Sequence, residues 1–353
     1  MTETINKLES SIENLKNKSA RIYFFVMDTK GNGKASIKYT YDMALMLKNQ
    51  GYNSIILHEK SDYVGVSSWL GEEYMNSLPH QYVEGQNLAI SPEDTILVPE
   101  IFGYVMSQIS NLPCAKIVLC QSYDYIFETL EPGQTWSQLG FSKCITTSEK
   151  MKTQISSIMR NVSIDVIEPF ISEEFKQSKF PAKPIVTVHT REQRDTVNFI
   201  KQFYVKYPQY RWISFRDMRG MSLKQLADGL KDAMVSVWMD KQSSFGTFPL
   251  ESMSCGVPVV GLAPSVQPEW MTEENGIWTL EQTKLVDMVA EYIQNWLEDN
   301  ISEKLFEKTL ETSQKYNNSE KFEKSVISAF ERYQDIRRSN FTMELNKIKQ
   351  ETV

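Results

Sequence analysis

The chain has 353 residues, too many for one ordinary hydrophobic core, so we expect two domains of about 150 residues each. Its 41% hydrophobic and 24% charged residues are typical of a soluble globular protein, and the net charge of −7 argues against a large nucleic-acid-binding surface. No stretch of about eighteen residues is apolar and uncharged, so no transmembrane segment is expected.

The cysteines and the N-terminus predict a cytoplasmic protein. The four cysteines show no metal-ligand spacing, and three histidines are too few for a His-based metal site to be expected. The first residues are polar and acidic, unlike a signal peptide. We therefore expect reduced, buried thiols and no metal.

The first half of the chain alternates between strand and helix patterns. The first eighteen residues have apolar side chains at helical spacing and predict an amphipathic surface helix. An apolar run from Arg21 to Met27 predicts a buried strand, followed by a glycine-containing loop. A helix is expected from Ile37 to Asn49, with Gly51 at its end. Further strands are expected from short apolar runs at residues 53–57, 94–98, 116–120 and 144–147, and the segment 164–170 closes this half of the chain.

The alternation restarts after residues 171–184, a polar segment with two prolines that predicts a linker. In this second half, helices are expected at 195–207 and 222–233, and the chain from Leu280 on is expected to be mostly helical. Strands are expected at residues 185–189, 210–215, 234–239 and 257–262.

Strands that alternate with helices predict parallel sheets covered on both faces. We therefore expect an α/β protein with two Rossmann-like, doubly wound domains at residues 20–172 and 182–320. An N-terminal helix (1–19) precedes them, and C-terminal helices (321–353) return to the first domain. Ligands bind at the carboxyl ends of such strands and between domains, so the binding site is expected in a cleft between the two domains.

The segment SSFGTFPLESMSCGVPVVGL, residues 243–262, lies between two expected strands of the second half. We expect a short helix that begins at Pro249, where a missing N–H does no harm, and ends at Gly256. Free N–H groups at a helix N-terminus suit a phosphate, and Gly246 allows a close approach. Glu251, expected in the first turn, could bind a vicinal diol such as ribose, or could simply be an acid favoured by the helix dipole.

This segment resembles the signature of the large retaining family of GT-B glycosyltransferases. The signature has a glutamate, a Phe-Gly pair, an apolar segment with a proline, a second glutamate, a small-residue helix and Gly-x-Pro-Val-Val. The segments TTSEKMKTQI, IDVIEPFISEEF and PEWMTEENGIWT also look like parts of that family. The matching positions of the signature are Phe245, Gly246, Pro249, Glu251, Met253, Cys255, Gly256, Pro258, Val259 and Val260.

The resemblance implies a GT-B fold in which the second domain holds most of a nucleotide-sugar donor. Glu251 would hold the ribose hydroxyls, and the backbone amides of Phe245, Gly246 and Thr247 would lie near the diphosphate and the sugar. No cofactor is implied, because the nucleotide sugar is itself the donor substrate.

Family members usually have an arginine after the first strand of the second domain and a lysine a few residues later, both for the diphosphate. Arg191 and Arg194 stand at these places, although both could instead be plain surface residues. Two guanidinium groups and a helix N-terminus can neutralise a leaving diphosphate, which fits a metal-independent reaction. Gly31 and Gly33 follow the first strand without P-loop spacing, and we expect their loop to face the donor or the acceptor.

Two positions depart from the family pattern. The first signature glutamate should stand eight residues before Glu251, and that position is Ser243. Asp240 could substitute for it, the transferred sugar could differ, or activity could be lost. On the acceptor side, Asp124 follows a strand after which many relatives have a histidine. Asp124 could orient a hydroxyl or act as a base, or it could be only a helix N-cap.

The sequence therefore predicts a hexosyltransferase-like enzyme that moves a sugar from a nucleotide-diphosphate sugar to a hydroxyl group with retention of configuration. The acceptor stays open between a glycan, a lipid, a protein and a modified base. One alternative is a degenerate GT-B protein that acts as a nucleotide-binding or scaffold subunit. Ser243 and the missing histidine keep this alternative open. Another is a sugar-nucleotide epimerase or hydrolase on the same fold, against which the scarcity of histidines weighs.

Overall fold

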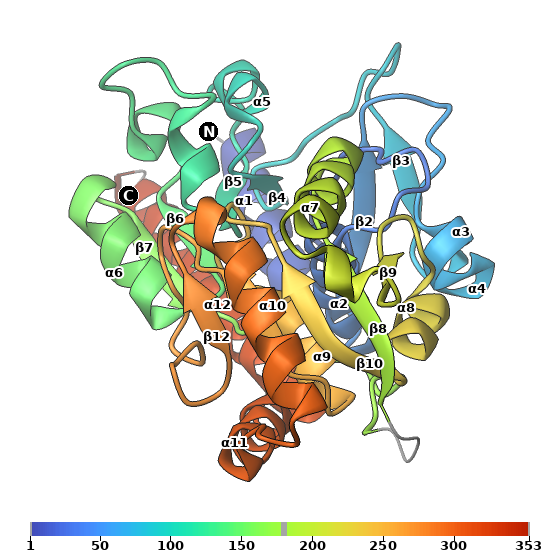
Figure 1. Cartoon of the computed structure of the whole chain (residues 1–353). Coiled ribbons are helices and arrows are strands. Elements are labelled where there is room, and N and C mark those ends of the chain that lie inside the picture. Colours follow the sequence, from blue (N-terminus) through green and yellow to red (C-terminus); the bar gives the residue numbers. More distant parts are fainter. Residues whose placement is uncertain (1, 178–181, 352–353) are drawn as a thin grey trace.

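The computed structural model describes residues 2–177 and 182–351, which form two parallel β-sheets with helices around them (Figure 1). The first sheet has the strand order β3-β2-β1-β4-β5-β6-β7, and the second has the order β12-β11-β10-β8-β9. The strands are β1 Arg21–Phe25, β2 Asn53–His58, β3 His80–Tyr82, β4 Thr95–Pro99, β5 Ala115–Cys120, β6 Lys143–Thr146, β7 Ser163–Val166, β8 Lys183–His189, β9 Ser214–Asp217, β10 Ala233–Trp238, β11 Val259–Leu262 and β12 Ile277–Thr279.

The connections between the strands are mostly helical. The helices are α1 Thr2–Lys16, α2 Ala35–Asn49, α3 Ser67–Leu70, α4 Glu72–Asn76, α5 Gly103–Gln108, α6 Glu149–Ile158, α7 Gln193–Lys206, α8 Leu223–Leu230, α9 Thr247–Ser254, α10 Gln282–Leu297, α11 Glu303–Gln314 and α12 Ser319–Glu351. Three short 3₁₀ helices complete the set, namely η1 Asp124–Phe127, η2 Trp136–Leu139 and η3 Pro208–Tyr210. Part of the predicted linker, residues 178–181, lies outside the described residues.

The central strands β1, β4, β5 and β10 are buried on both faces, which explains why they are nearly continuous apolar runs. In β1, Ile22 and Phe24 pack in a core with α2, whereas Tyr23 and Phe25 pack in a second core with residues of α5 and α6. The second sheet is covered by α8 and α9 on one face and by α7 and α10 on the other. The prediction of two doubly wound α/β domains is confirmed.

The chain ends in one long helix that belongs to the first domain. α12 has 33 residues and packs against α1 and α2, and its Phe322, Val326 and Phe330 are buried in the same core as Ile22 and Phe24 (Figure 1). The expectation of several helices after residue 320 was wrong. No glycine or proline interrupts the segment from Ser319 to Glu351, so nothing breaks the helix.

Arg337 anchors α12 to the first sheet. Its guanidinium donates hydrogen bonds to the carbonyl oxygens of Pro92 (2.6 Å), Glu93 (2.8 Å) and Asp94 (3.2 Å) and to Oγ1 of Thr95 (3.0 Å). The residue is 8% exposed.

We expect Arg337→Ala to lower the free energy of unfolding by about 2–4 kcal/mol, because it leaves several buried acceptors without a donor. The neighbouring Arg338 is a matched control, since it is partly exposed and its side chain pairs, among the described residues, only with Asp335 one turn away. Arg338→Ala should change stability by less than about 0.5 kcal/mol. Urea unfolding measures both variants, and equal effects would contradict the anchoring role.

Candidate functional site

Two loops at the carboxyl ends of the two sheets contact each other directly. One follows β5 in the first domain, and the other follows β10 in the second. Ser122 Oγ donates to the carbonyl oxygen of Gln242 (2.6 Å), Tyr123 N donates to Ser244 Oγ (3.0 Å), and Tyr125 Oη donates to Gln242 Oε1 (3.0 Å). The two domains are therefore in direct contact at the carboxyl ends of β5 and β10, where a cleft was expected.

Arg191 lies at the centre of this contact. It follows β8 by two residues, and its Nε donates to Oδ1 of Asp240 at 2.6 Å, while a terminal N–H donates to the hydroxyl of Tyr125. The guanidinium carbon also lies 5.1 Å from the centroid of the Tyr125 ring. Burial acts to lower the pKa of Arg191, but the Asp240 carboxylate outweighs it and the net pKa is raised. Arg191 is thus a fixed cation between the two domains.

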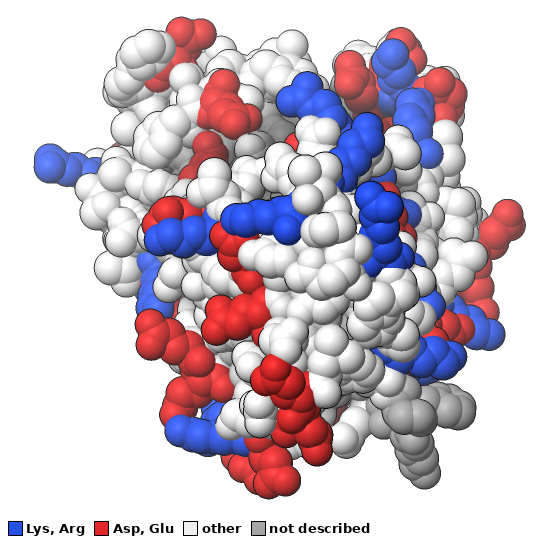
Figure 2. Space-filling model, in the orientation of Figure 1, with Lys and Arg blue, Asp and Glu red and all other residues white. Residues whose placement is uncertain are grey.

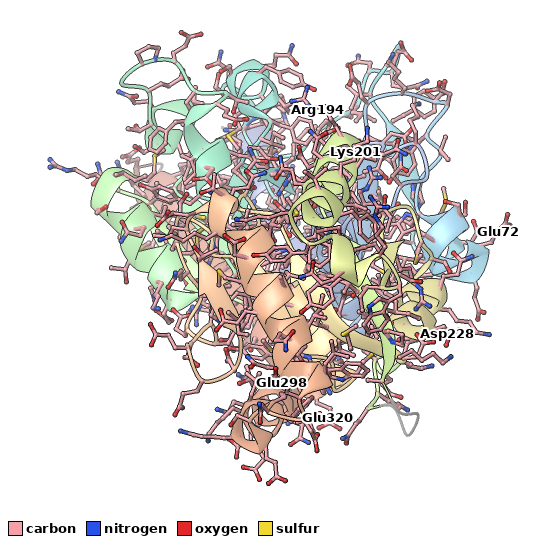
Figure 3. All side chains as sticks on the ribbon, viewed as in Figure 1. Glu72, Arg194, Lys201, Asp228, Glu298 and Glu320 are labelled. Carbon is pink, nitrogen blue, oxygen red and sulfur yellow. The ribbon has the colours of Figure 1, made fainter. Side chains whose placement is uncertain are left out.

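Asp240, proposed from sequence as a substitute acid, is 9% exposed and is paired with this arginine. It also accepts a hydrogen bond from the backbone N–H of Gln242 at 3.1 Å, which fixes the turn after β10. Arg194, the second predicted phosphate ligand, lies in the first turn of α7 and is exposed (Figure 3). The structure therefore brings Arg191 and Asp240 together and leaves Arg194 on the surface of α7.

The turn before α9 depends on Gly246. Its φ of 73° is left-handed, and a Cβ atom there would lie 3.0 Å from Cη2 of Trp238 and 3.2 Å from Cζ2 of Trp270. Only glycine fits this conformation and these contacts. The N–H of Gly246 donates to Ser243 Oγ at 3.3 Å. Ser243, which stands where the family signature has its first glutamate, therefore stabilises the turn.

Helix α9 begins two residues earlier than predicted. Thr247 is its first residue, Pro249 is the third, and Glu251 is the fifth, so the placement of Glu251 in the first turn was wrong. The reason is that the left-handed Gly246 starts the helix at once. No side chain caps the N-terminus of α9 among the described residues. Phe245 is buried, its ring packs edge-on against Tyr316 with ring centroids 5.5 Å apart, and its carbonyl oxygen accepts a hydrogen bond from Nε1 of Trp270 at 2.8 Å.

Glu251 is a partly buried carboxyl group with no hydrogen-bond partner among the described residues. Burial raises its pKa to about 7, against the opposing effect of the Lys38 ammonium group from α2 of the first domain. Lys38 is itself paired with Asp42 at 2.7 Å. Glu251 is therefore within electrostatic range of the first domain and changes its charge near neutral pH.

The loop between β1 and α2 also reaches the second domain. The carbonyl oxygen of Gly31 accepts from Ser68 Oγ at 3.0 Å, within the first domain. A Cβ atom on Gly33 would lie 3.3 Å from the Trp69 ring and 3.5 Å from the carbonyl oxygen of Met221, which belongs to the second domain. Gly33 thus lies at ordinary contact distance from the second domain, and its tighter neighbour, Trp69, belongs to the first domain, as does Ser68 next to Gly31.

Asp124, the predicted acceptor-side acid, is the first residue of η1. Its Oδ2 accepts a hydrogen bond from Ser265 Oγ of the second domain at 3.3 Å, and it makes no N-cap hydrogen bond, because the N-cap residue of η1 is Tyr123. Asp124 is therefore at the domain contact.

Glu100 is a buried acid at this contact that the sequence did not single out. It follows β4, is 4% exposed, and accepts the backbone N–H of Ser122 at 2.7 Å through Oε1. Burial raises the pKa of Glu100 to about 7, although the N–H groups of Gln121 and Ser122 and the charge of Arg191 oppose this rise. The sequence signal that could have identified Glu100 is its position directly after the apolar run ILVP.

His189, the last residue of β8, stacks on Phe248 with ring centroids 4.5 Å apart, and its Nδ1 has no partner among the described residues. Burial lowers the pKa of His189 to about 4, so the ring is neutral at pH 7.

The described residues contain no group of three or more His, Cys, Asp or Glu side chains that could hold a metal ion. Likewise, none of the helices described is long and apolar enough to cross a membrane.

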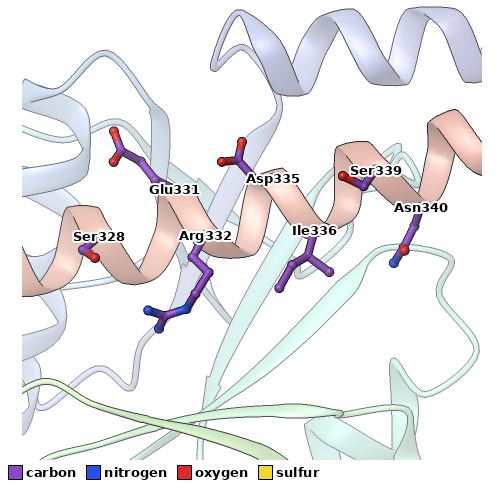
Figure 4. Close-up of a pocket in the computed structure, with 7 residues that line it drawn as sticks. All are labelled: Ser328, Glu331, Arg332, Asp335, Ile336, Ser339 and Asn340. Carbon is purple, nitrogen blue, oxygen red and sulfur yellow. The ribbon is translucent and has the colours of Figure 1, made fainter.

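A separate hollow of about 530 Å³ lies along α12, and none of its lining residues belongs to these loops (Figure 4). All seven lining residues come from this one helix, and Figure 4 shows Glu331 and Asp335 on one side of it and Arg332 and Ile336 on the other. The side chains do not converge on a point. On the face seen in Figure 2, basic and acidic side chains are interspersed.

Comparison with known proteins agrees with this architecture. Residues 219–316, which include the turn before α9 and Glu251, match the family described as Glycosyl transferases group 1. The fold is similar to that of sucrose-phosphate synthase from Thermosynechococcus elongatus, with a TM-score of 0.63 and 13% identity over 91% of this chain and 100% of that one. It is also similar to Anabaena HepE in complex with UDP, with a TM-score of 0.60 and 10% identity over 88% of this chain and 99% of that one. The chain therefore has the GT-B fold.

One curated relative is an alpha-1,6-glucosyltransferase of Actinobacillus pleuropneumoniae serotype 7 (strain AP76). It is 22% identical over 199 residues, which are 54% of this chain. The match spans 60% of the relative's own length.

Proposed function

We propose that the protein is a glycosyltransferase that moves a sugar from a nucleoside-diphosphate sugar to a hydroxyl group, with retention of configuration and without a metal. The observation that carries the proposal is the turn at Gly246, which starts α9 next to the domain contact and is followed by Glu251. This turn lies in the region that matches the family. Arg191, at the end of the neighbouring strand β8, adds the positive charge that a diphosphate requires.

These residues suggest how the reaction proceeds. The bond between the anomeric carbon and the diphosphate oxygen breaks, and the leaving diphosphate is stabilised by the Arg191 guanidinium and the N–H groups of α9. The acceptor hydroxyl attacks the oxocarbenium-like carbon from the same face and gives its proton to the departing phosphate oxygen. This route requires no protein nucleophile, so a serine at position 243 is compatible with it.

The donor is best sought among uridine nucleotides. HepE, which shares the fold, is described in complex with UDP and with UDP-glucose, and the curated relative is a glucosyltransferase. We therefore propose UDP-glucose as the first donor to test, followed by other UDP-, ADP- and GDP-sugars.

The direct test is the release of nucleoside diphosphate from this panel, with simple glycosides as acceptors. We expect one donor to be consumed and its sugar to appear on an acceptor with the anomeric configuration of the donor. Binding of a nucleotide without turnover of any donor would favour the scaffold alternative, to which Ser243 points. Binding of no nucleotide at all would contradict both proposals.

The role of Glu251 can be tested through pH. Its pKa of about 7 lies above the usual value of 4.5, so the group is protonated below pH 7 and becomes a carboxylate above it. Only the carboxylate accepts two hydrogen bonds from a ribose diol, so UDP affinity should rise between pH 6 and pH 8. We expect Glu251→Gln to weaken UDP binding at pH 8 by about tenfold, the effect of one hydrogen bond to a charged group.

Isothermal titration calorimetry measures this effect, with 2′-deoxy-UDP as the control ligand. Glu251→Gln should remove the part of the pH dependence that depends on the ribose hydroxyl and should bind UDP and 2′-deoxy-UDP almost equally. UDP binding as tight as that of the unchanged protein would disprove the assignment of Glu251 to the ribose.

A further inference from the structure

The guanidinium of Arg191 is held from both domains at once. Asp240, from its own domain, accepts the Nε–H at 2.6 Å. Tyr125, from the first domain, accepts a terminal N–H through its hydroxyl and places its ring 5.1 Å from the guanidinium carbon. The orientation of this cation therefore depends on a side chain outside the domain that carries it.

These contacts leave most of the donors of Arg191 free for a ligand. A guanidinium has five N–H groups in a planar fork, and Asp240 and Tyr125 use two of them. The three others have no partner among the described residues. The two contacts thus fix the plane of the guanidinium and leave three N–H groups free to donate. Bidentate phosphate binding needs this arrangement.

Tyr125 is itself held firmly. Its hydroxyl donates to Oε1 of Gln242 at 3.0 Å while it accepts from Arg191, so both functions of the phenol are used. Burial raises the pKa of Tyr125, which keeps the hydroxyl protonated and able to donate. Behind it, the buried Glu100 accepts the N–H of Ser122, and Ser122 Oγ donates to the Gln242 carbonyl oxygen.

We propose that Tyr125 is a positioning residue for the donor site: it holds the Arg191 guanidinium in the orientation that binds a diphosphate, and it does so only when the two domains are in contact. The inference rests on the proposed function, because it assumes that Arg191 binds the diphosphate of a nucleotide. It adds that the first domain takes part in donor binding through a hydroxyl group, and that binding of the diphosphate and contact between the domains favour each other.

The test compares Tyr125→Phe with Tyr123→Phe in the full-length chain. Tyr125→Phe keeps the ring next to Arg191 and removes only the hydroxyl. Tyr123 is a matched control from the same turn, since it contacts the second domain through its backbone N–H and its hydroxyl has no hydrogen-bond partner among the described residues. Calorimetry with UDP and with uridine separates the phosphate-dependent part of binding from the rest.

We expect Tyr125→Phe to raise the Kd for UDP about five- to tenfold and to change the Kd for uridine less than twofold. With UDP-glucose as donor, KM should rise more than kcat falls. Tyr123→Phe should match the unchanged protein in both measurements. If a nucleotide with another base binds better than UDP, the pair UDP and uridine is replaced by ADP and adenosine or by GDP and guanosine.

The outcomes separate the two proposals. If the unchanged protein binds UDP and Tyr125→Phe binds it equally well, the positioning role is wrong and the proposed function stands. If Tyr125→Phe weakens uridine and UDP alike, Tyr125 has only a general structural role and the inference is also wrong. If the unchanged protein binds none of the three nucleoside diphosphates, the proposed function fails and the inference fails with it.

Discussion

Replacing Arg191 by alanine is expected to lower kcat/KM for the nucleotide sugar by about 100- to 1,000-fold, the usual cost of losing a charged group that stabilises the reacting centre. Arg191→Ala removes the cation between the domains and leaves the Asp240 carboxylate, 9% exposed, without its partner. Arg194→Ala should lower kcat/KM less than about threefold, because this exposed residue on α7 has no ion pair or hydrogen bond among the described residues (Figure 3).

Steady-state kinetics with the donor found in the panel measures both arginine variants, and melting temperatures show whether each variant is folded. Arg191→Lys is the informative intermediate, since it keeps the charge but loses the fork that contacts Asp240 and Tyr125 together. Similar losses for Arg191→Ala and Arg194→Ala would instead support the sequence-based expectation that both arginines hold the diphosphate.

Gly246→Ala is expected to lower the free energy of unfolding by about 2–4 kcal/mol and to abolish tight nucleotide binding. The new methyl group would require a left-handed backbone at a non-glycine residue and would press against Trp238 and Trp270. Relief of that contact would move the turn that starts α9. Stability and binding should therefore be lost together.

Gly51 provides the matched control for this glycine. Its φ of 84° is also left-handed, but a Cβ atom there would meet nothing within 4 Å. Gly51→Ala should therefore cost only the backbone term of about 1–2 kcal/mol and leave nucleotide binding unchanged. Urea unfolding and calorimetry measure both variants. Equal losses of stability would show that the two tryptophans do not restrict position 246.

The central strands were predictable because each is a short, buried apolar run. The runs at residues 53–57, 94–98 and 116–120 correspond to β2, β4 and β5, with ends that differ by at most one residue. Elements without such a run were missed. β3 and β12 have three residues each and are only partly buried, so their sequences carry no strong hydrophobic pattern.

The start of α9 shows a different limit. Pro249 is compatible with any position in the first turn, so the sequence could not distinguish a helix that begins at Thr247 from one that begins at Pro249. The left-handed conformation of Gly246 decides between them, and it depends on how Trp238 and Trp270 pack around the turn.

The contacts of the candidate site could not be predicted from local sequence patterns, because they join residues that are far apart in the chain. Arg191 was predicted from its place after a strand, but its partners Tyr125 and Asp240 are 66 and 49 residues away in the chain. The role of Glu100 likewise depends on the turn after β5. Such pairs can be identified only from the folded structure, in which the loops after the strands come together.

The return of α12 to the first sheet has a consequence for how the protein is made. The core that contains Ile22 and Phe24 also contains Phe322, Val326 and Phe330, so one face of the first sheet is covered only in part, by α2, until α12 has left the ribosome. The second sheet, from Lys183 to Thr279, is formed by one continuous stretch of chain together with its covering helices. The domain synthesised second can therefore complete its core first, which reverses the usual order of folding during translation.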